Sequence, residues 1–135
     1  MAEAVPQDWE RARAVMEIWN ADGPAAMAER FWHPDIVWTE PEHFPDAGVH
    51  RGRDECVRRM RERFDLLGRV TMEVVGVSRF GERTVIEAIM RGSGLVSGAP
   101  AEAREWFVVE TDGQAAITFR EFLDRDEAEA AAQAD

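Results

Sequence analysis

Three glutamates lie in strand-like segments where a carboxyl group could carry out proton chemistry. Glu121 belongs to the segment ITFREFL, and it would share one strand face with Ile117, Phe119 and Leu123 because side chains alternate along a strand. An acid on such an apolar face either reaches solvent at the end of the strand or sits in a pocket, where lost hydration raises its pKa. The pocket alternative would suit Glu121 for proton transfer near neutral pH.

Glu40 and Glu105 also lie in strand-like segments. Glu40 ends the short segment IVWTE and shares a face with Trp38, and Glu105 precedes Trp106 in the segment AREWFVV. Two carboxyl groups that face one apolar pocket cannot both ionise cheaply, so their pKa values separate into an acid and a base. Enolisation, aldol-type cyclisation and epoxide opening all need such a pair. The alternative is that Glu40 and Glu105 are ordinary surface residues.

Histidines and one arginine could assist this chemistry. His43 and His50 lie in the loop PEHFPDAGVHRG, where a neutral imidazole could act as a base or a donor, or simply face solvent. Arg91 follows an apolar strand and could bind a substrate carbonyl or carboxylate, or instead pair with Glu87 on the same strand. The histidines lack the spacing of a metal site, so neither a metal nor a cofactor is expected.

Composition excludes several classes of function. The net charge of −11 argues against binding to nucleic acid or to an anionic membrane. All 16 basic residues are arginine, so no lysine is present for a Schiff base or a phosphate-binding loop. The single cysteine, Cys56, rules out an intrachain disulfide, and no signal-peptide or membrane-spanning pattern is visible. We therefore expect a cytoplasmic protein.

The elements that would position these residues can be followed along the chain, which has the size of one domain over 1–135. Periodicity and end signals predict helices, with Asp8 capping the first and Asp124 and Glu127 forming a capping box for the last. Alternation and the Asp112–Gly113 pair predict strands and a two-residue hairpin. The predicted helices are 8–20, 24–32, 54–68 and 125–132, and the predicted strands are 36–40, 70–80, 83–91, 103–111 and the segment after residue 113.

This order of elements implies an α+β fold. Four consecutive strands would form an antiparallel meander, and the amphipathic helices from the first half of the chain would cover its concave face. A Gly/Ser-rich stretch, GSGLVSGAP, would link two of the strands.

The stretches HPDIVWTEP, PDAGVHRGRD and DGQAAITFREFLDRDEAEAA, taken with this element order, resemble the nuclear transport factor 2-like superfamily. The likeness runs over about 9–132 and is greatest to the SnoaL-like and ketosteroid-isomerase-like branch. It implies a cone-shaped curved antiparallel sheet with three helices from the N-terminal half enclosing a deep apolar pocket. Members of the superfamily include steroid isomerases, polyketide cyclases and limonene-type epoxide hydrolases, as well as many proteins of no known activity.

The resemblance carries over to this chain only in part. Glu40 falls where ketosteroid isomerases have their aspartate base, and Glu105 falls near their protonated aspartate. Val15 takes the place of the isomerase tyrosine, because the chain contains no tyrosine. Glu121 falls where limonene-type epoxide hydrolases have one of two acids, but their Arg-x-Asp pair is not visible in IEAIMRG. No single mechanism of the superfamily therefore transfers intact.

Two functions remain open at this point. The first is a cofactor-free acid/base enzyme of the isomerase, cyclase or epoxide-hydrolase type, acting on a small hydrophobic polyketide- or terpenoid-like substrate. Glu40 or Glu121 would shuttle the proton and His50 would be an auxiliary donor. The second is a non-catalytic cone that binds a ligand or a protein. The residues expected to bind substrate are Trp19, Trp38, His43, Arg91, Glu105, Phe107 and Phe119, although the tryptophans could instead pack the core.

A homodimer is also expected. Trp106 and Val108 lie on the strand face opposite Glu105, Phe107 and Val109, so both faces of that strand are apolar. The outer face needs cover, and a second subunit would provide it.

Overall fold

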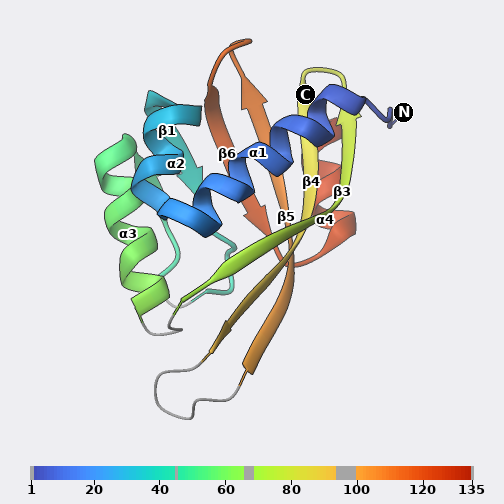
Figure 1. Cartoon of the computed structure of the whole chain (residues 1–135). Helices are drawn as coiled ribbons and strands as arrows, with labels where there is room; N and C mark the ends of the chain where they lie inside the picture. Colours follow the sequence, from blue (N-terminus) through green and yellow to red (C-terminus); the bar gives the residue numbers. More distant parts are fainter. Residues whose placement is uncertain (1, 45, 66–68, 94–99, 135) are drawn as a thin grey trace.

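One curved mixed sheet carries the fold of the described residues (Figure 1). The computed structural model describes residues 2–44, 46–65, 69–93 and 100–134. The helices are α1 (Pro6–Asp22), α2 (Pro24–Phe31), α3 (Arg53–Asp65) and α4 (Arg125–Gln133). The strands are β1 (Trp32–Thr39), β2 (Val49–Arg51), β3 (Thr71–Phe80), β4 (Arg83–Ser93), β5 (Pro100–Thr111) and β6 (Ala116–Phe122), in the sheet order β2-β1-β6-β5-β4-β3.

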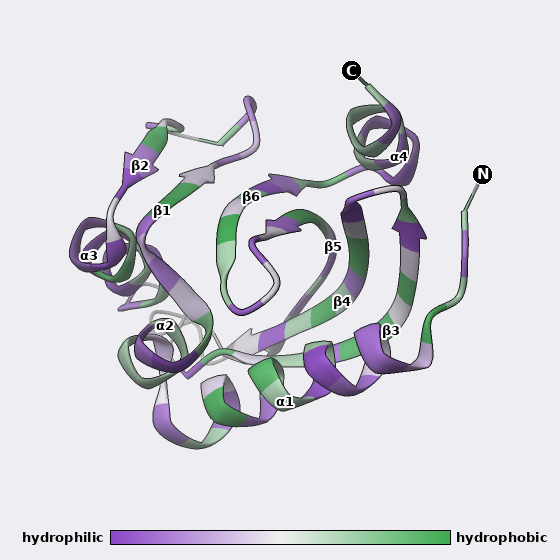
Figure 2. Ribbon diagram, turned by 90° about the horizontal axis from the view of Figure 1, so that it is seen from above, coloured by the Kyte–Doolittle hydropathy of each residue, from purple (hydrophilic) through white to green (hydrophobic). Residues whose placement is uncertain are grey.

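The predicted α+β cone is confirmed, with an addition at one edge. β3 to β6 form the expected antiparallel meander, but β1 pairs with β6 in parallel and β2 pairs with β1 in antiparallel orientation. Seen from above, the strands follow an arc that α1 closes on its concave side (Figure 2). The short strand β2 was not predicted, because three residues are too few to show an alternating pattern.

The helices on the concave side bury apolar stripes at the predicted spacing. α1 buries Ala12, Met16 and Trp19, which are spaced four and three residues apart as one face of a helix requires. It begins at Pro6 rather than at the predicted cap Asp8, since proline suits the first turn of a helix. Gly23 ends α1 at φ 91°, and its N–H donates to the carbonyl of Trp19. These helices and the inner sheet face enclose the main core.

Two turn regions bear on the predictions. The hairpin at Asp112 is longer than the predicted two-residue turn: the Asp112 carboxylate accepts hydrogen bonds from the N–H groups of Gln114 and Ala115 at 2.9 and 2.8 Å. These bonds close a four-residue loop, 112–115, in which Gly113 takes φ 98°. The predicted end of the third helix at 66–68 and most of the Gly/Ser-rich link, 94–99, lie outside the described residues.

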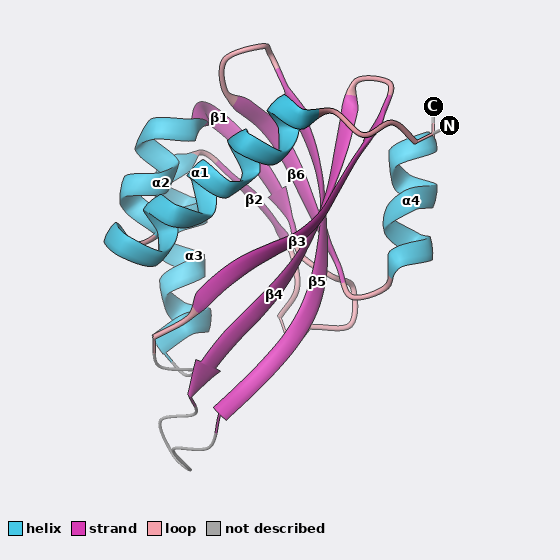
Figure 3. Cartoon of the chain, turned by 45° about the vertical axis from the view of Figure 1, so that its right-hand side comes forward, coloured by secondary structure: helices cyan, strands magenta, loops and turns pink. Residues whose placement is uncertain are grey.

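The outer face of the sheet is covered by the chain's own last helix (Figure 3). Ala128 and Ala132 of α4 pack with Val85 and Val108 in a second apolar cluster. The predicted cap is present, because the Asp124 side chain accepts from the N–H of Glu127. α4 therefore supplies the cover that the sequence had assigned to a second subunit. The homodimer stays a prediction, but the apolar outer face of β5 is no longer a reason to expect it.

No helix within the described ranges is long and apolar enough to cross a membrane.

The packing of α4 predicts a position-specific loss of stability. Ala128 is fully buried against the sheet, whereas Ala130 on the same helix is exposed. Ala128→Asp places an unpaired charge under the helix and should lower the free energy of unfolding by about 3 kcal/mol. Ala130→Asp, which makes the same change on the solvent side, should lower it by less than about 1 kcal/mol. Urea denaturation measures both, and equal losses would contradict the packing of α4.

Candidate functional site

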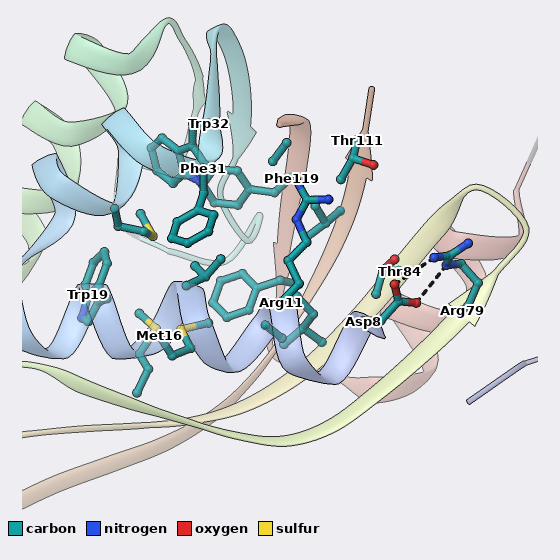
Figure 4. Close-up of a pocket in the computed structure, with 18 of the residues that line it drawn as sticks. Asp8, Arg11, Met16, Trp19, Phe31, Trp32, Arg79, Thr84, Thr111 and Phe119 are labelled. Carbon is teal, nitrogen blue, oxygen red and sulfur yellow. Dashed lines mark hydrogen bonds and ion pairs between the residues drawn. The ribbon is translucent and has the colours of Figure 1, made fainter. Parts of the chain in front are cut away.

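An apolar cavity of about 450 Å³ lies between α1, α2 and the concave face of the sheet (Figure 4). This size lies within the range of small-molecule pockets. Its wall comes from both helices and from strands on the inner face, and it includes Met16, Trp19, Phe31, Trp32, Phe107 and Phe119. The indole N–H of Trp19 donates to the carbonyl of Val70 at 3.1 Å, so this ring presents carbon to the cavity. The cavity therefore suits a molecule with a hydrophobic body.

One end of the cavity is polar. It lies where the start of α1 approaches the β3–β4 turn and the β5–β6 loop (Figure 1). Asp8 accepts two hydrogen bonds from Arg79, at 2.8 and 2.9 Å, and Figure 4 shows this pair at the rim. Arg11 reaches across from α1 and donates to the carbonyl of Gln114 in the loop. These contacts join the helix to both turns.

Three buried glutamates lie further along the same concave face. Glu40, Glu105 and Glu121 are only 3%, 2% and 3% exposed. Phe107 pairs directly with Glu121 in the sheet register, so their side chains point to the same side. Glu105 lies two residues before Phe107 and Glu121 two residues after Phe119, a spacing of about 7 Å along each strand. The acids thus begin one side-chain layer beyond the cavity wall, and none of the three lines the cavity.

Arg63 of α3 is the central cation of this acid cluster. Its guanidinium donates to both carboxylate oxygens of Glu121, at 2.8 and 3.1 Å, and approaches Glu40 at 3.5 Å. The same group lies 4.4 Å from the ring centroid of Phe44 and 5.4 Å from that of Trp38. Bidentate pairing with a carboxylate and stacking on aromatic rings are the geometries that arginine prefers.

Glu40 is held as an anion by several donors. The Arg59 guanidinium donates to its two oxygens at 2.8 and 3.2 Å, and the His50 imidazole makes a further close contact. Burial opposes its ionisation, but hydrogen bonds from Arg59 and His50 and the charges of Arg59 and Arg63 together lower the pKa of Glu40. His50 comes from β2, opposite Trp38 in the register, and its side chain is 13% exposed.

The surroundings of Glu105 disfavour its ionisation, whereas those of Glu40 favour it. Burial, the negative charge of Glu121 and a hydrogen bond between the two carboxyl groups raise the pKa of Glu105 to about 9. It therefore keeps its proton at neutral pH and donates it toward Glu121. The Oε2 atom of Glu105 is buried without a hydrogen-bond partner among the described residues. Such an atom is available to a group that enters the site.

A family model described as a SnoaL-like domain matches residues 12–121. The chain belongs to the SnoaL-like family. This confirms the resemblance seen in the sequence, and the buried acids are thus the polar centre of a SnoaL-like cone. No curated protein matches the chain.

Solved structures show the same fold over almost the whole SnoaL-like chain. An NTF2-like protein from Burkholderia thailandensis is 25% identical, with a TM-score of 0.71 over 95% of this chain and 98% of its own. An NTF2-like protein of unknown function from Burkholderia pseudomallei is 20% identical, with a TM-score of 0.72 over 96% of this chain and 100% of its own. A candidate SnoaL-like polyketide cyclase from Jannaschia is 17% identical, with a TM-score of 0.70 over 98% of both chains.

The structure brings together some of the residues predicted to bind substrate. Trp19, Phe107 and Phe119 line the cavity. Trp38 lies behind the wall, where its ring stacks on Phe119 with centroids 5.6 Å apart and its N–H donates to Glu121 at 3.2 Å. Trp38 therefore links the cavity wall to the acid cluster rather than facing the cavity.

Two other predicted binding residues lie away from the cavity. His43 is exposed in the loop after β1. Arg91 is 46% exposed and pairs with Glu73 and Glu102 at 2.8 and 3.1 Å, so the suggested pairing with Glu87 was wrong. Glu87 instead accepts from Trp106, Arg104 and Arg125 on the outer face, which helps to fix α4.

Sequence reasoning missed the two arginines of the acid cluster. It assigned no role to Arg59 or to Arg63, yet both reach the buried glutamates. Their separation by four residues puts them on one helix face, which was the available signal. In the described part of the chain, no group of three or more His, Cys, Asp or Glu is arranged to hold a metal ion.

The proton retained by Glu105 predicts a pH-dependent effect of Glu105→Gln. The folded pKa of about 9 exceeds the unfolded value of about 4.3, so between them the folded state binds more protons and the wild type loses stability as pH rises. The variant lacks this loss. Its free energy of unfolding, minus that of the wild type, should increase by about 1 kcal/mol per pH unit between about pH 5 and 8. Urea titrations across this range measure the slope, with Glu102→Gln on the exposed part of the same strand as control; a difference independent of pH would contradict a protonated Glu105.

Removing the central cation should be far more damaging than removing an exposed one. Arg63→Met leaves Glu121 buried without its bidentate partner and should lower the free energy of unfolding by about 3–5 kcal/mol. Arg61→Met, two residues away and exposed, is the matched control and should change it by less than about 0.5 kcal/mol. The double variant Arg63→Met/Glu121→Gln should recover part of the loss, because the unpaired carboxylate is gone. Additive losses in this double-mutant cycle would show that the two side chains are not coupled.

Proposed function

We propose that the chain is a cofactor-free acid–base enzyme that acts on a small hydrophobic molecule held in the apolar cavity. One observation carries the proposal. Glu105 keeps a proton at neutral pH, its Oε2 is unpartnered, and it lies directly beyond the cavity wall next to the carboxylate of Glu121. A protonated carboxyl group beside a second carboxyl group is the arrangement that enol chemistry needs.

Glu105 is the general acid in this proposal. In the resting site its O–H donates to Glu121; when a substrate enters, this O–H turns to the oxygen of a carbonyl or epoxide and transfers the proton as negative charge develops there. Glu121 is the base that removes a proton from carbon; the sequence had left this role open between Glu40 and Glu121. Arg63 holds both oxygens of Glu121 and so fixes the orientation of this base.

Substrate must pass the two rings that separate the cavity from the acids. The rings of Phe107 and Phe119 have centroids 6.4 Å apart, and both contribute to the cavity wall. A general acid acts within about 3 Å of its target oxygen, so these rings have to turn aside when a substrate binds. A planar or cyclic apolar carbonyl compound of polyketide or terpenoid type would replace their contacts with its own.

The other two predicted catalytic residues receive supporting roles. Glu40 is surrounded by Arg59, Arg63 and His50, and its lowered pKa makes it a fixed negative charge. His50 lies on the more exposed side of the cluster and remains the proposed auxiliary donor. Isomerisation, cyclisation and epoxide opening all remain compatible with an acid and a base placed in this way.

A second candidate function is ligand binding without turnover. The observation that favours it is that no buried acid lines the cavity, because Phe107 and Phe119 stand between. In that case the acid cluster would only stabilise the narrow end of the cone. The predicted homodimer and the cytoplasmic location stay open under both functions.

Solvent-deuterium exchange separates the two functions. The wild type is incubated in D₂O with a panel of cyclic ketones, and deuterium incorporation next to the carbonyl is followed by NMR; epoxide opening is followed in parallel. Glu105→Gln keeps the shape and a hydrogen-bond donor but has no transferable proton, so the rate should fall by about 100-fold or more. Binding, followed by the fluorescence of Trp19 and Trp32 in the cavity wall, should change by less than about threefold.

Glu102→Gln is the control for the loss of one glutamate from β5 and should keep full activity. Wild-type rates equal to those in buffer, together with micromolar binding, would support the binding function. Full activity in Glu105→Gln would remove Glu105 from the mechanism.

A further inference from the structure

Arg11 is a cation in the cavity that has no carboxylate partner among the described residues. Two arginines line this cavity, and Arg79 is neutralised by its bidentate pair with Asp8. Arg11 donates to the main-chain carbonyl of Gln114, and it forms no ion pair with any described carboxylate. A neutral carbonyl satisfies a hydrogen bond but does not balance the charge of a half-buried guanidinium.

The surrounding carboxylates do not offset this charge directly. Asp112 turns its side chain to the N–H groups of Gln114 and Ala115, which lower its pKa and hold it in its own loop. Glu82 lies in the β3–β4 turn and forms no ion pair with a described residue. Figure 4 shows Arg11 rising from α1 toward Thr111, alongside Phe119. Its guanidinium therefore lies over the apolar cavity, on the side of the Thr111 hydroxyl of β5.

We propose that the cavity takes an amphipathic monocarboxylate, with its apolar body among the aromatic and methionine side chains and its carboxylate on Arg11. This proposal rests on the cavity being the ligand site of the proposed function, and it adds the chemical class of the ligand. On binding, Arg11 exchanges the carbonyl of Gln114 for the carboxylate, which accepts two parallel hydrogen bonds. The end of the molecule remote from the carboxylate then points toward Phe107 and the buried acids.

The overall negative charge of the protein weakens the binding of any anion. The ionic strength of the assay therefore determines whether the favourable contact with Arg11 can be measured. The net charge of −11 repels anions at a distance. At about 0.15 M salt, charges more than about 8 Å apart in solvent are largely screened, whereas a partly buried pair is screened much less. Measurements at this ionic strength therefore report the contact with Arg11.

The test compares three probes that share one apolar chain. Decanoate, decanol and decylamine are titrated into the full chain by calorimetry at about pH 7.5 and below their micelle concentrations. Decanoate should bind at least about tenfold more tightly than decanol, because a charge-assisted pair replaces a neutral hydrogen bond. Arg11→Met should abolish this preference, and Arg11→Lys should keep part of it because the charge remains. Thermal melts verify that each variant is folded.

Arg13→Met is the matched control. Arg13 is exposed on the same helix, where its guanidinium lies 5.2 Å from the ring centroid of Trp9, and its loss should leave the preference unchanged. Equal affinity for decanoate and decanol, a preference that survives in Arg11→Met, or tightest binding of decylamine would each overturn the proposal. Failure of all three probes to bind would overturn it as well.

The outcome is separable from that of the proposed enzyme. The preference for decanoate reports on the Arg11 end of the cavity, whereas turnover reports on the acid pair beyond Phe107 and Phe119. A preference lost only in Arg11→Met, without turnover of any ketone, would support the ligand class and count against the enzyme. Turnover of uncharged ketones at the same rate in wild type and Arg11→Met, without a preference for decanoate, would do the reverse.

Discussion

The ion pair between Arg63 and Glu121 is the interaction on which the polar centre depends. Three carboxyl groups are buried there, and an unpaired buried charge is very costly. Arg59 and Arg63 provide two positive charges for Glu40 and Glu121. Glu105, the third, forms no ion pair with a described residue, so it is accommodated by keeping its proton. The protonated state of Glu105 is thus a consequence of charge balance as well as of burial.

Helix α3 joins this polar centre to the apolar cavity. Met60 lines the cavity, and Arg63, three residues later, reaches the acids. On the sheet, Trp38 makes the same connection, because one side of its ring stacks on Phe119 while its N–H donates to Glu121. A shift of the Phe119 ring would therefore move the Trp38 indole and change its hydrogen bond to Glu121. Through these contacts, a ligand in the cavity would affect the acid pair without touching it.

The sequence predicted the elements better than it predicted their partners. Periodicity located α1 to α4 and the meander. The apolar strand face left Glu121 open between solvent and burial, and the structure shows it buried. Arg59 and Arg63 were missed because an arginine side chain is long enough to leave the flank of a helix and reach a strand, and periodicity does not encode that reach. The cover of Val108 by α4 was missed for a related reason. The apolar stripe of an amphipathic C-terminal helix indicates that the helix packs on something, but it does not indicate which face of the sheet it covers.

The burial of Glu105 links the acid cluster chemically to the apolar cavity. Burial is the largest cause of the raised pKa of Glu105, so any water that entered behind Phe107 would lower that pKa and release the proton. In the proposed function, a hydrophobic molecule that displaces the ring would fill the space without hydrating the acid, and its carbonyl oxygen would take over the Glu105 O–H from Glu121. The acid would keep its proton until such an acceptor arrives. The preference for a hydrophobic substrate and the retention of a transferable proton would then both follow from the exclusion of water.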